Sequence, residues 1–206
     1  MKIAKYSCFA IGTALLLTAL FLVLHNTSED RRSGKQAQEL LDVLLEQIPE
    51  APAQETLPAG GDLFAEYVQE AATEPVIEVD GRQYLGIVTI PSLGIELPVL
   101  ADWSYPDLKL APCRYRGSVD GGDLIVAAHN YRSHFGTIGS LSTEDRILFT
   151  DAAGYVHTYE VDNIEQIPGT DIERMEFGSG EDWDLTLFTC TLSGQSRVTV
   201  RARLVQ

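Results

Sequence analysis

A cysteine and an arginine near the C-terminus are spaced so that they could act together on a substrate. Cys190 ends a strand-like run over residues 185–190, and Arg197 opens the alternating run that follows. Ser193 and Gly194 between the runs predict the two-residue turn of a β-hairpin. In that register Cys190 lies opposite Arg197, and a neighbouring cation favours the thiolate form of a cysteine over the thiol. The pattern predicts an activated nucleophile.

Side-chain alternation along this hairpin predicts which face carries the chemistry. Leu185 and Leu187 share one face with Val200, and this apolar face is expected to be the core. Cys190 and Arg197 project together from the opposite face. The thiol and the guanidinium are therefore expected side by side outside the core.

A histidine upstream supplies a candidate acid–base group. His129 directly follows the apolar run 124–128, so its backbone is held by a predicted strand while its side chain stays free to transfer protons. His134 is the rival candidate, and its alternative is a loop histidine that is solvated or bonded to the backbone. Only His129 directly follows a predicted strand, so we assign the general acid–base role to it.

Three strings resemble the sortase family, the cysteine transpeptidases of Gram-positive-type bacteria. The string TLFTC at residues 186–190, with Arg197 seven residues after the cysteine, resembles the family's TLxTC strand end and its catalytic arginine. The string AHN at residues 128–130 resembles the family's GHN string, with alanine in place of glycine. Residues 84–99 resemble the opening strands of a sortase barrel. The resemblance spans about residues 76–206.

The resemblance implies roles for the candidate site residues. Cys190 would be the nucleophile, His129 the general acid–base, and Arg197 the group that stabilises the oxyanion and the substrate. Thr189 would position the substrate or the backbone beside the nucleophile, although its alternative is an ordinary β-branched strand residue. The substrate-binding candidates are Thr189, Asn130 and His134.

The resemblance also implies a reaction and partners. A sortase would cleave a Leu-Pro-x-Thr-Gly-like sorting signal on a surface protein after Thr, through a thioester on Cys190. The acyl group would pass to an amine from a cell-wall precursor or from a pilin lysine. Two alternatives remain: another exported Cys/His acyltransferase or peptidase such as an L,D-transpeptidase, whose Ser-x-Gly-Cys-like string is absent, and a non-catalytic membrane-tethered β-domain that binds peptide or wall polymer.

The elements that must position these residues are predicted to be strands. From residue 76 onward, short β-rich runs alternate with Gly, Pro, Asn and Asp, which is typical of an all-β barrel or sandwich. With the resemblance, we expect a closed sortase-like β-barrel of about seven to eight strands with short helices over residues 76–206. A second hairpin is expected to turn near residues 152–154. The expected strands are 84–90, 97–100, 124–128, 146–150, 155–167, 185–190 and 198–205.

The N-terminal part predicts a membrane anchor and a stalk. Residues 8–24 carry no charge and follow two lysines, a pattern that predicts an uncleaved transmembrane signal anchor over residues 1–25, with a cleaved signal peptide as the alternative. Residues 26–75 are expected to form a stalk, with an amphipathic helix at 35–48 and a linker at 49–62. We therefore expect a single-pass protein of the cell membrane whose catalytic domain is extracytoplasmic.

Net charge and the spacing of cysteines indicate which partners and metal or disulfide sites to expect. The formal net charge of -15 disfavours nucleic acid as a partner. The three cysteines and the histidines lack metal-ligand spacing, so no metal and no cofactor are expected. Cys113 is expected to be a buried or partly buried free thiol, with a disulfide to Cys190 as the alternative. The acidic segment Asp171 to Asp184 is expected to be solvated, and a calcium site is its alternative.

Overall fold

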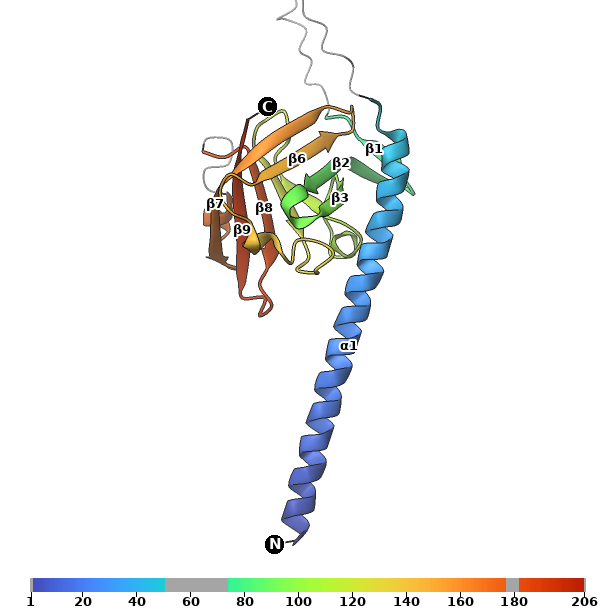
Figure 1. Cartoon of the computed structure of the whole chain (residues 1–206), viewed down its shortest axis with the longest axis vertical. Coiled ribbons are helices and arrows are strands. Elements are labelled where there is room, and N and C mark those ends of the chain that lie inside the picture. Colours follow the sequence, from blue (N-terminus) through green and yellow to red (C-terminus); the bar gives the residue numbers. More distant parts are fainter. Residues whose placement is uncertain (1, 51–73, 177–181, 206) are drawn as a thin grey trace, which may run out of the picture.

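A long N-terminal helix leads into a β-barrel in the computed structural model, which describes residues 2–50, 74–176 and 182–205 (Figure 1). The helix is α1 (Lys2–Gln47), and a short helix α2 (Ile172–Glu176) precedes the last two strands. The strands are β1 (Ile77–Val79), β2 (Arg82–Ile90), β3 (Ile95–Leu100), β4 (Cys113–Arg116), β5 (Leu124–Ala128), β6 (Arg146–Asp151), β7 (Val156–Pro168), β8 (Leu185–Cys190) and β9 (Ser196–Leu204). Connections between the described strands contain the 3-10 turns η2 (Pro91–Leu93), η3 (Asp107–Lys109) and η4 (Ile138–Ser140).

The strands close into a barrel because the last strand in the sheet pairs back with the second. The order is β1-β2-β3-β4-β5-β8-β9-β7-β6, and β6 also pairs with β2. β1 extends the sheet beside β2, and the other eight strands form the closed ring. The β3–β4 and β5–β8 pairs are parallel and the remaining pairs are antiparallel. The predicted all-β barrel of seven to eight strands with short helices is confirmed.

Strand β5 is apolar on both faces because both faces are covered. Leu124, Val126 and Ala128 belong to the main core inside the barrel. Ile125 and Ala127 face outward and pack in a second cluster with Met175 of α2 and Phe188 of β8. Burial on both sides explains why this strand is a continuous apolar run rather than an alternating one.

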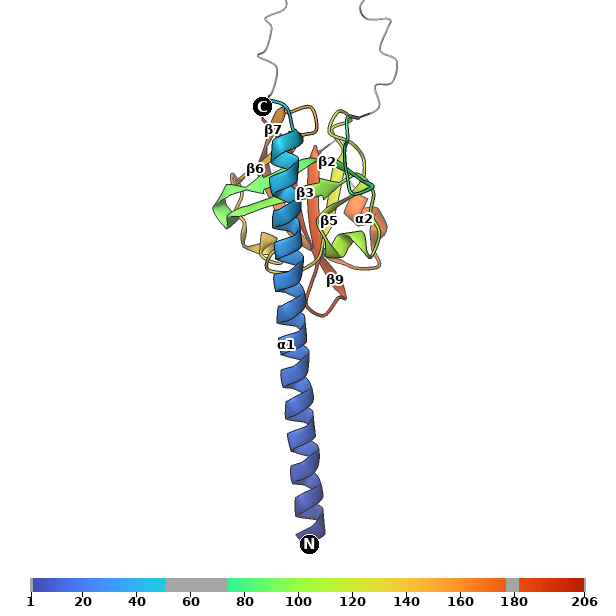
Figure 2. The same cartoon turned by 90° about the vertical axis from the view of Figure 1, so that its right-hand side faces the viewer.

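Helix α1 divides into an exposed apolar half and a half that packs on the barrel. It is long and apolar enough to cross a membrane, and its most apolar window has a mean hydropathy of 1.9 and is not buried at all. Farther along, Ser33, Ala37, Leu41 and Leu44 form one buried stripe at helical spacing. Leu41 and Leu44 pack with residues of β1 to β4, including Tyr84. Figure 2 shows α1 running across the barrel beside β2 and β3 and continuing well beyond it.

The amphipathic helix expected at 35–48 is thus present as the continuation of the apolar helix. Its apolar stripe covers the barrel, because Leu41 and Leu44 are buried in one cluster with barrel residues. The physical reason is that the leucine stripe of the helix would be exposed to water if the helix stood by itself. Packing the stripe on the sheet buries this apolar surface, which is favourable. The assignment of residues 26–75 as a stalk stays a prediction. The expected linker at 49–62 falls mostly within 51–73, outside the described residues.

The β8–β9 hairpin has the expected register with a different turn. Cys190 pairs with Arg197, as expected. The amide of Gly194 donates to the carbonyl of Thr191 at 2.8 Å, so the β-turn has Leu192 and Ser193 at its centre rather than Ser193 and Gly194, and Gly194 adopts a left-handed φ of 72°. The register is unaffected because the amide of Thr191 still donates to the carbonyl of Ser196, at 2.9 Å. The other expected hairpin, at residues 152–154, joins β6 to β7.

Arg201 is a fully buried arginine that joins α2 to the β8–β9 pair. Its guanidinium donates to the carbonyls of Met175 at 2.6 Å and Arg174 at 2.8 Å, and to the hydroxyl of Thr186 at 3.0 Å. It also lies 5.0 Å from the ring centroid of Trp183. A single side chain therefore satisfies several buried polar groups at once.

We predict that Arg201→Ala destabilises the fold. Two carbonyls and a hydroxyl would lose their donor, and removing one partner of such a buried charged network costs about 3–5 kcal/mol of unfolding free energy. The matched control is Arg203→Ala on the same side of β9, because the Arg203 side chain is 52% exposed and its ion pair with Asp162 is 3.7 Å long. Its cost should be about 0–1 kcal/mol. Urea unfolding of both variants measures the difference, and equal costs would contradict the structural role of Arg201.

Candidate functional site

Three of the predicted site residues meet at the ends of three adjacent strands. β5 and β8 are parallel neighbours in which Ala128 pairs with Thr189, so His129 and Cys190 follow side by side at the carboxyl ends of their strands. Adjacent strands lie about 4.8 Å apart. Cys190 pairs with Arg197 on its other side, in β9. Cys190 therefore lies between His129 and Arg197 in the order of the strands.

Thr189 ties the two central strand ends together. Its hydroxyl donates to the carbonyl of Ala128 at 2.9 Å, and its side chain is buried. Because this bond joins the residues immediately before His129 and Cys190, it maintains the spacing between them. Of the two roles expected for Thr189, the contact supports positioning of the backbone.

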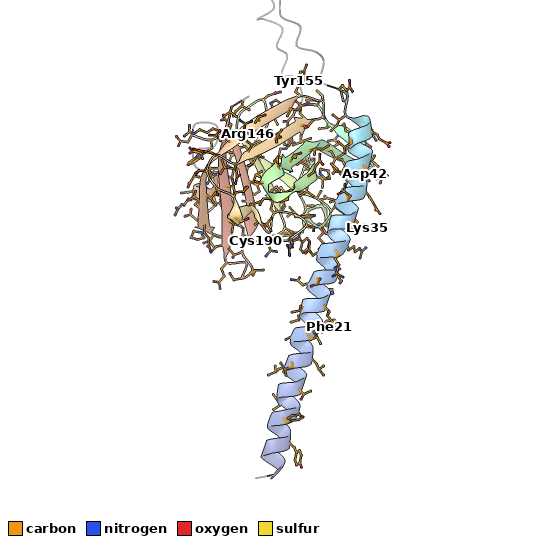
Figure 3. All side chains as sticks on the ribbon, in the orientation of Figure 1. Phe21, Lys35, Asp42, Arg146, Tyr155 and Cys190 are labelled. Atoms are coloured by element: carbon orange, nitrogen blue, oxygen red, sulfur yellow. The ribbon has the colours of Figure 1, made fainter. Side chains whose placement is uncertain are left out.

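A groove of about 720 Å³ lies beside Cys190. One wall comes from the loop after β5 and from η4, and the other comes from the β8–β9 hairpin. Its lining includes Asn130, Gly136, Thr137, Cys190, Leu192 and Val198. Figure 3 shows Cys190 at the end of the barrel that lies nearer the N-terminal half of α1. Asn130 is thus placed to contact a molecule bound beside the thiol, as its substrate-binding assignment requires.

The guanidinium of Arg197 is held by the hairpin and keeps its charge available. Its Nη1 atom lies 3.1 Å from the carbonyl of Gly194 and 3.2 Å from that of Ser196. Within residues 2–50, 74–176 and 182–205, no carboxylate forms an ion pair with Arg197. A charge that the protein leaves unneutralised can act on a negative group that develops at Cys190.

His129 is a partly buried histidine in its neutral form at neutral pH. Burial lowers its pKa, and the positive charge of Lys109 lowers it further. Its ring packs at a tilt against Tyr131, with the centroids 4.9 Å apart and the ring planes at 36°. Its Nε2 atom is buried and has no hydrogen-bond partner in the described part of the chain. A neutral imidazole with a free nitrogen can accept a proton and pass it on.

His134 is placed differently from what its substrate-binding assignment requires. Its ring is 0% exposed and it does not line the groove beside Cys190. Its Nε2 atom lies 3.0 Å from the hydroxyl of Ser33 in α1, and burial lowers its pKa to about 4. This position gives no support to the assignment, which stays a prediction. His134 is a neutral, buried loop histidine because α1 covers it.

The two cysteines of the described region differ in environment. Both Cys113 and Cys190 are free, so the alternative disulfide is not formed. Cys113 is fully buried beneath α1, and burial raises the pKa of its thiol to about 12, whereas Cys190 is partly exposed. Cys113 is therefore the buried thiol that was expected.

The acidic segment before β8 is only partly described. Residues 172–176 form α2, whereas residues 177–181 lie outside the described residues. The alternative of calcium binding by this segment therefore stays a prediction.

Two residues near His129 were missed by sequence reasoning. Tyr131 packs on the imidazole, and its position two residues after His129 was the available signal. Lys109 acts on His129 from η3, twenty residues earlier in the chain, and no local pattern pointed to it. Only the packing of η3 against the loop after β5 brings the charge of Lys109 within range.

We predict that Lys109→Gln raises the pKa of His129. Losing a nearby positive charge removes a penalty on the imidazolium form, so the pKa moves upward toward its ordinary value. A pH titration of the histidine NMR signals measures the change, with His129 assigned from His129→Gln. Lys35→Gln is the control, because Lys35 is exposed on α1 and pairs with Glu39. An unchanged or lowered pKa in Lys109→Gln would contradict the interaction.

Comparisons with known proteins agree on one family. Residues 88–205, more than half of the chain, match the family model of the sortase domain. Sortase C1 of Streptococcus agalactiae is 27% identical over 63% of this chain and 71% of its own, with a TM-score of 0.55. Sortase C of Streptococcus pneumoniae is 20% identical over 87% and 89%, with a TM-score of 0.54. Sortase A of Corynebacterium diphtheriae is 17% identical over 92% and 96%, with a TM-score of 0.53.

A search of curated proteins found no match. The structural neighbours include sortases named A, C and C1, so they leave the subclass open. The family model and the closed barrel nevertheless agree, and the chain belongs to the sortase family of cysteine transpeptidases.

Proposed function

We propose that this protein is a membrane-anchored sortase that cleaves an LPxTG-like sorting signal after threonine and transfers the acyl fragment that ends in this threonine to an amine. The observation that carries the proposal is the order of Cys190 between His129 and Arg197 on the neighbouring strands β5, β8 and β9. This order sets a nucleophile between a proton carrier and a cation that has no carboxylate partner among the described residues. Covalent acyl transfer can be carried by groups of these kinds.

The first half of the proposed reaction forms a thioester. His129, neutral because of its lowered pKa, takes the proton of the Cys190 thiol, and the thiolate attacks the carbonyl carbon of the substrate threonine. Arg197 and backbone N–H groups near Cys190 stabilise the tetrahedral oxyanion. His129 then returns the proton to the leaving amine as the peptide bond breaks.

The second half transfers the acyl group. An incoming amine attacks the thioester carbon, His129 takes a proton from the amine, and the Cys190 thiol re-forms as the new amide is made. A cell-wall precursor and a pilin lysine are both candidate acceptors. Sortase C of Streptococcus pneumoniae is described in terms of pilin substrate specificity, which makes the pilin lysine an acceptor worth testing.

The proposed location is the outer side of the cell membrane, with α1 as a single-pass anchor. The apolar half of α1 stands clear of the barrel, and the large apolar side chains from Phe9 to Leu24 are exposed, as a lipid-facing segment requires. In this arrangement the end of the barrel that carries Cys190 faces the membrane (Figure 3). Substrate proteins and acceptors held at the membrane surface would meet the groove directly.

We predict that the full-length protein in nanodiscs forms an acyl-enzyme with sorting-signal peptides. Mass spectrometry of the protein after incubation with a panel of LPxTG-like peptides should show the acyl group on Cys190 and cleavage after threonine. Cys190→Ala should form no adduct, because it lacks the thiol. Cys113→Ala should keep most of the activity, because Cys113 is buried away from the groove. An adduct in folded Cys190→Ala, or none in the wild type with any peptide, would reject the proposed function.

We also predict a graded loss of turnover at Arg197. Arg197→Ala should lower turnover by about a hundredfold to a thousandfold, the usual loss for one oxyanion donor. Arg197→Lys should recover only part of this, because an ammonium lacks the forked geometry of a guanidinium. Arg203→Ala on the same strand is the control, since its exposed side chain lies far along β9 from Cys190. Equal turnover in Arg197→Ala and Arg203→Ala would remove Arg197 from the mechanism.

A further inference from the structure

Helix α1 makes a polar contact with the loop that carries His129. Residues 129–136, called here the His129 loop, run from the end of β5 toward η4. Asp30 of α1 accepts hydrogen bonds from this loop: its carboxylate lies 3.1 Å from the amide of Ser133 and 2.6 Å from the hydroxyl of Ser133. These bonds join residues 103 positions apart in the sequence.

Ser33, one turn later in α1, makes a second contact with the same loop. Its hydroxyl donates to the carbonyl of Lys109 in η3. A serine hydroxyl has only one hydrogen, so the Nε2–H group of His134 must be the donor in the 3.0 Å bond to Ser33. Both Ser33 and His134 are buried. Ser33 therefore connects the helix, η3 and the His129 loop through a single oxygen atom.

A glycine lets the helix and the loop approach closely. Gly34 belongs to α1 and faces Ser133, and a Cβ atom at this position would lie 2.7 Å from the Cβ atom of Ser133. Glycine inside a helix costs about 1 kcal/mol relative to alanine. The close approach gives a physical reason for glycine at this point of α1.

The same loop returns to His129. The amide of Phe135, the residue after His134, donates to the carbonyl of His129 at 3.2 Å. Tyr131 packs between the two histidine rings, with centroids 4.9 Å from His129 and 5.6 Å from His134. His134, which Ser33 holds, thus reaches the His129 imidazole through Tyr131, and Ser133, which Asp30 holds, is the residue before His134.

We propose that α1 positions His129 for catalysis, with Asp30 and Ser33 acting as positioning residues through the His129 loop. The kinetic consequence rests on the proposed function, whereas the structural coupling does not. Without these bonds the loop loses three polar contacts with the helix, and the imidazole loses its fixed placement beside Cys190. A misplacement of about 1 Å of a catalytic group can cost about a hundredfold in rate.

The coupling also connects the active site to the membrane segment. α1 is one continuous helix, and Asp30 follows Leu24, the end of the exposed apolar run, by six residues. At about 1.5 Å per residue this is about 9 Å along the helix. The helix that anchors the protein thus also holds the loop that carries the acid–base group.

The test compares four variants of the full-length protein in nanodiscs. Asp30→Ala and Ser33→Ala should each lower kcat by about tenfold to a hundredfold while KM for a sorting-signal peptide stays nearly unchanged, because neither residue lines the groove. Asp30→Asn should recover most of the rate, since an amide oxygen still accepts from Ser133. Asp42→Ala is the matched control, because Asp42 is exposed on the same helix (Figure 3) and should leave kcat unchanged.

Gly34→Ala tests the same contact without removing a bonding group. Alanine favours the helix by about 1 kcal/mol, but its methyl group must displace Ser133. The variant should therefore keep α1 intact and still lower kcat. This keeps the proposal testable if Asp30→Ala or Ser33→Ala fails to fold.

An NMR measurement separates this proposal from the proposed function. The imidazole signal of His129 should shift in Asp30→Ala, Ser33→Ala and Gly34→Ala, and should stay in place in Asp42→Ala. If the wild type transfers no peptide, the function fails and the His129 signal still decides the coupling. If the wild type is active but the folded variants keep both kcat and the wild-type His129 signal, the coupling is rejected and the function stands.

Discussion

The parallel pairing of β5 with β8 is the constraint on which the site depends. These strands are far apart in the sequence, and their pairing in one direction brings two carboxyl ends to the same edge of the barrel. His129 and Cys190 directly follow the last residue pair of this ladder, Ala128 and Thr189, so they are neighbours at that edge. A shift of one residue in either strand would turn one of the two side chains toward the core. The Thr189 bond to Ala128 and the burial of β5 on both faces oppose such a shift.

The hairpin and α2 complete the site from the other side. The antiparallel β8–β9 register sets Arg197 beside Cys190, while the next arginine on the same face, Arg201, is buried under α2. Two arginines four residues apart on one strand therefore differ in burial and in hydrogen bonding. Arg197 is partly exposed near the hairpin turn and has no carboxylate partner among the described residues. Arg201 is buried, donates its hydrogen bonds to two backbone carbonyls and lies 3.5 Å from the carboxylate of Glu165.

Local electrostatics at the site differ from the charge of the whole chain. The protein carries a net charge of -15, but Arg197 is the strand partner of Cys190 and the charge that acts on His129 is that of Lys109. Lys109 disfavours the imidazolium form of His129, as does burial of the ring. His134 is buried and neutral as well, so the pair of histidines adds no positive charge to the loop at neutral pH. The result is an imidazole prepared to take a proton rather than one already charged.

Much of this protein follows from its sequence alone. Strand periodicity and turn residues predicted an all-β barrel or sandwich, and the family resemblance favoured the closed barrel. The hairpin register was correct although the turn differs, because Thr191 and Ser196 remain opposed when the loop between them changes shape. The apolar run before Leu24 and the leucine stripe farther along α1 were also visible as patterns of hydrophobicity.

Tertiary structure decided what local patterns cannot encode, which is the contact between distant segments. Nothing near His134 indicated that α1 would cover it, so a substrate-binding role was assigned to a residue that is buried against Ser33. Lys109 reaches His129 only because η3 packs beside the loop after β5. Periodicity reports which side of an element is apolar, whereas the partner that covers that side is set by the packing of the whole chain.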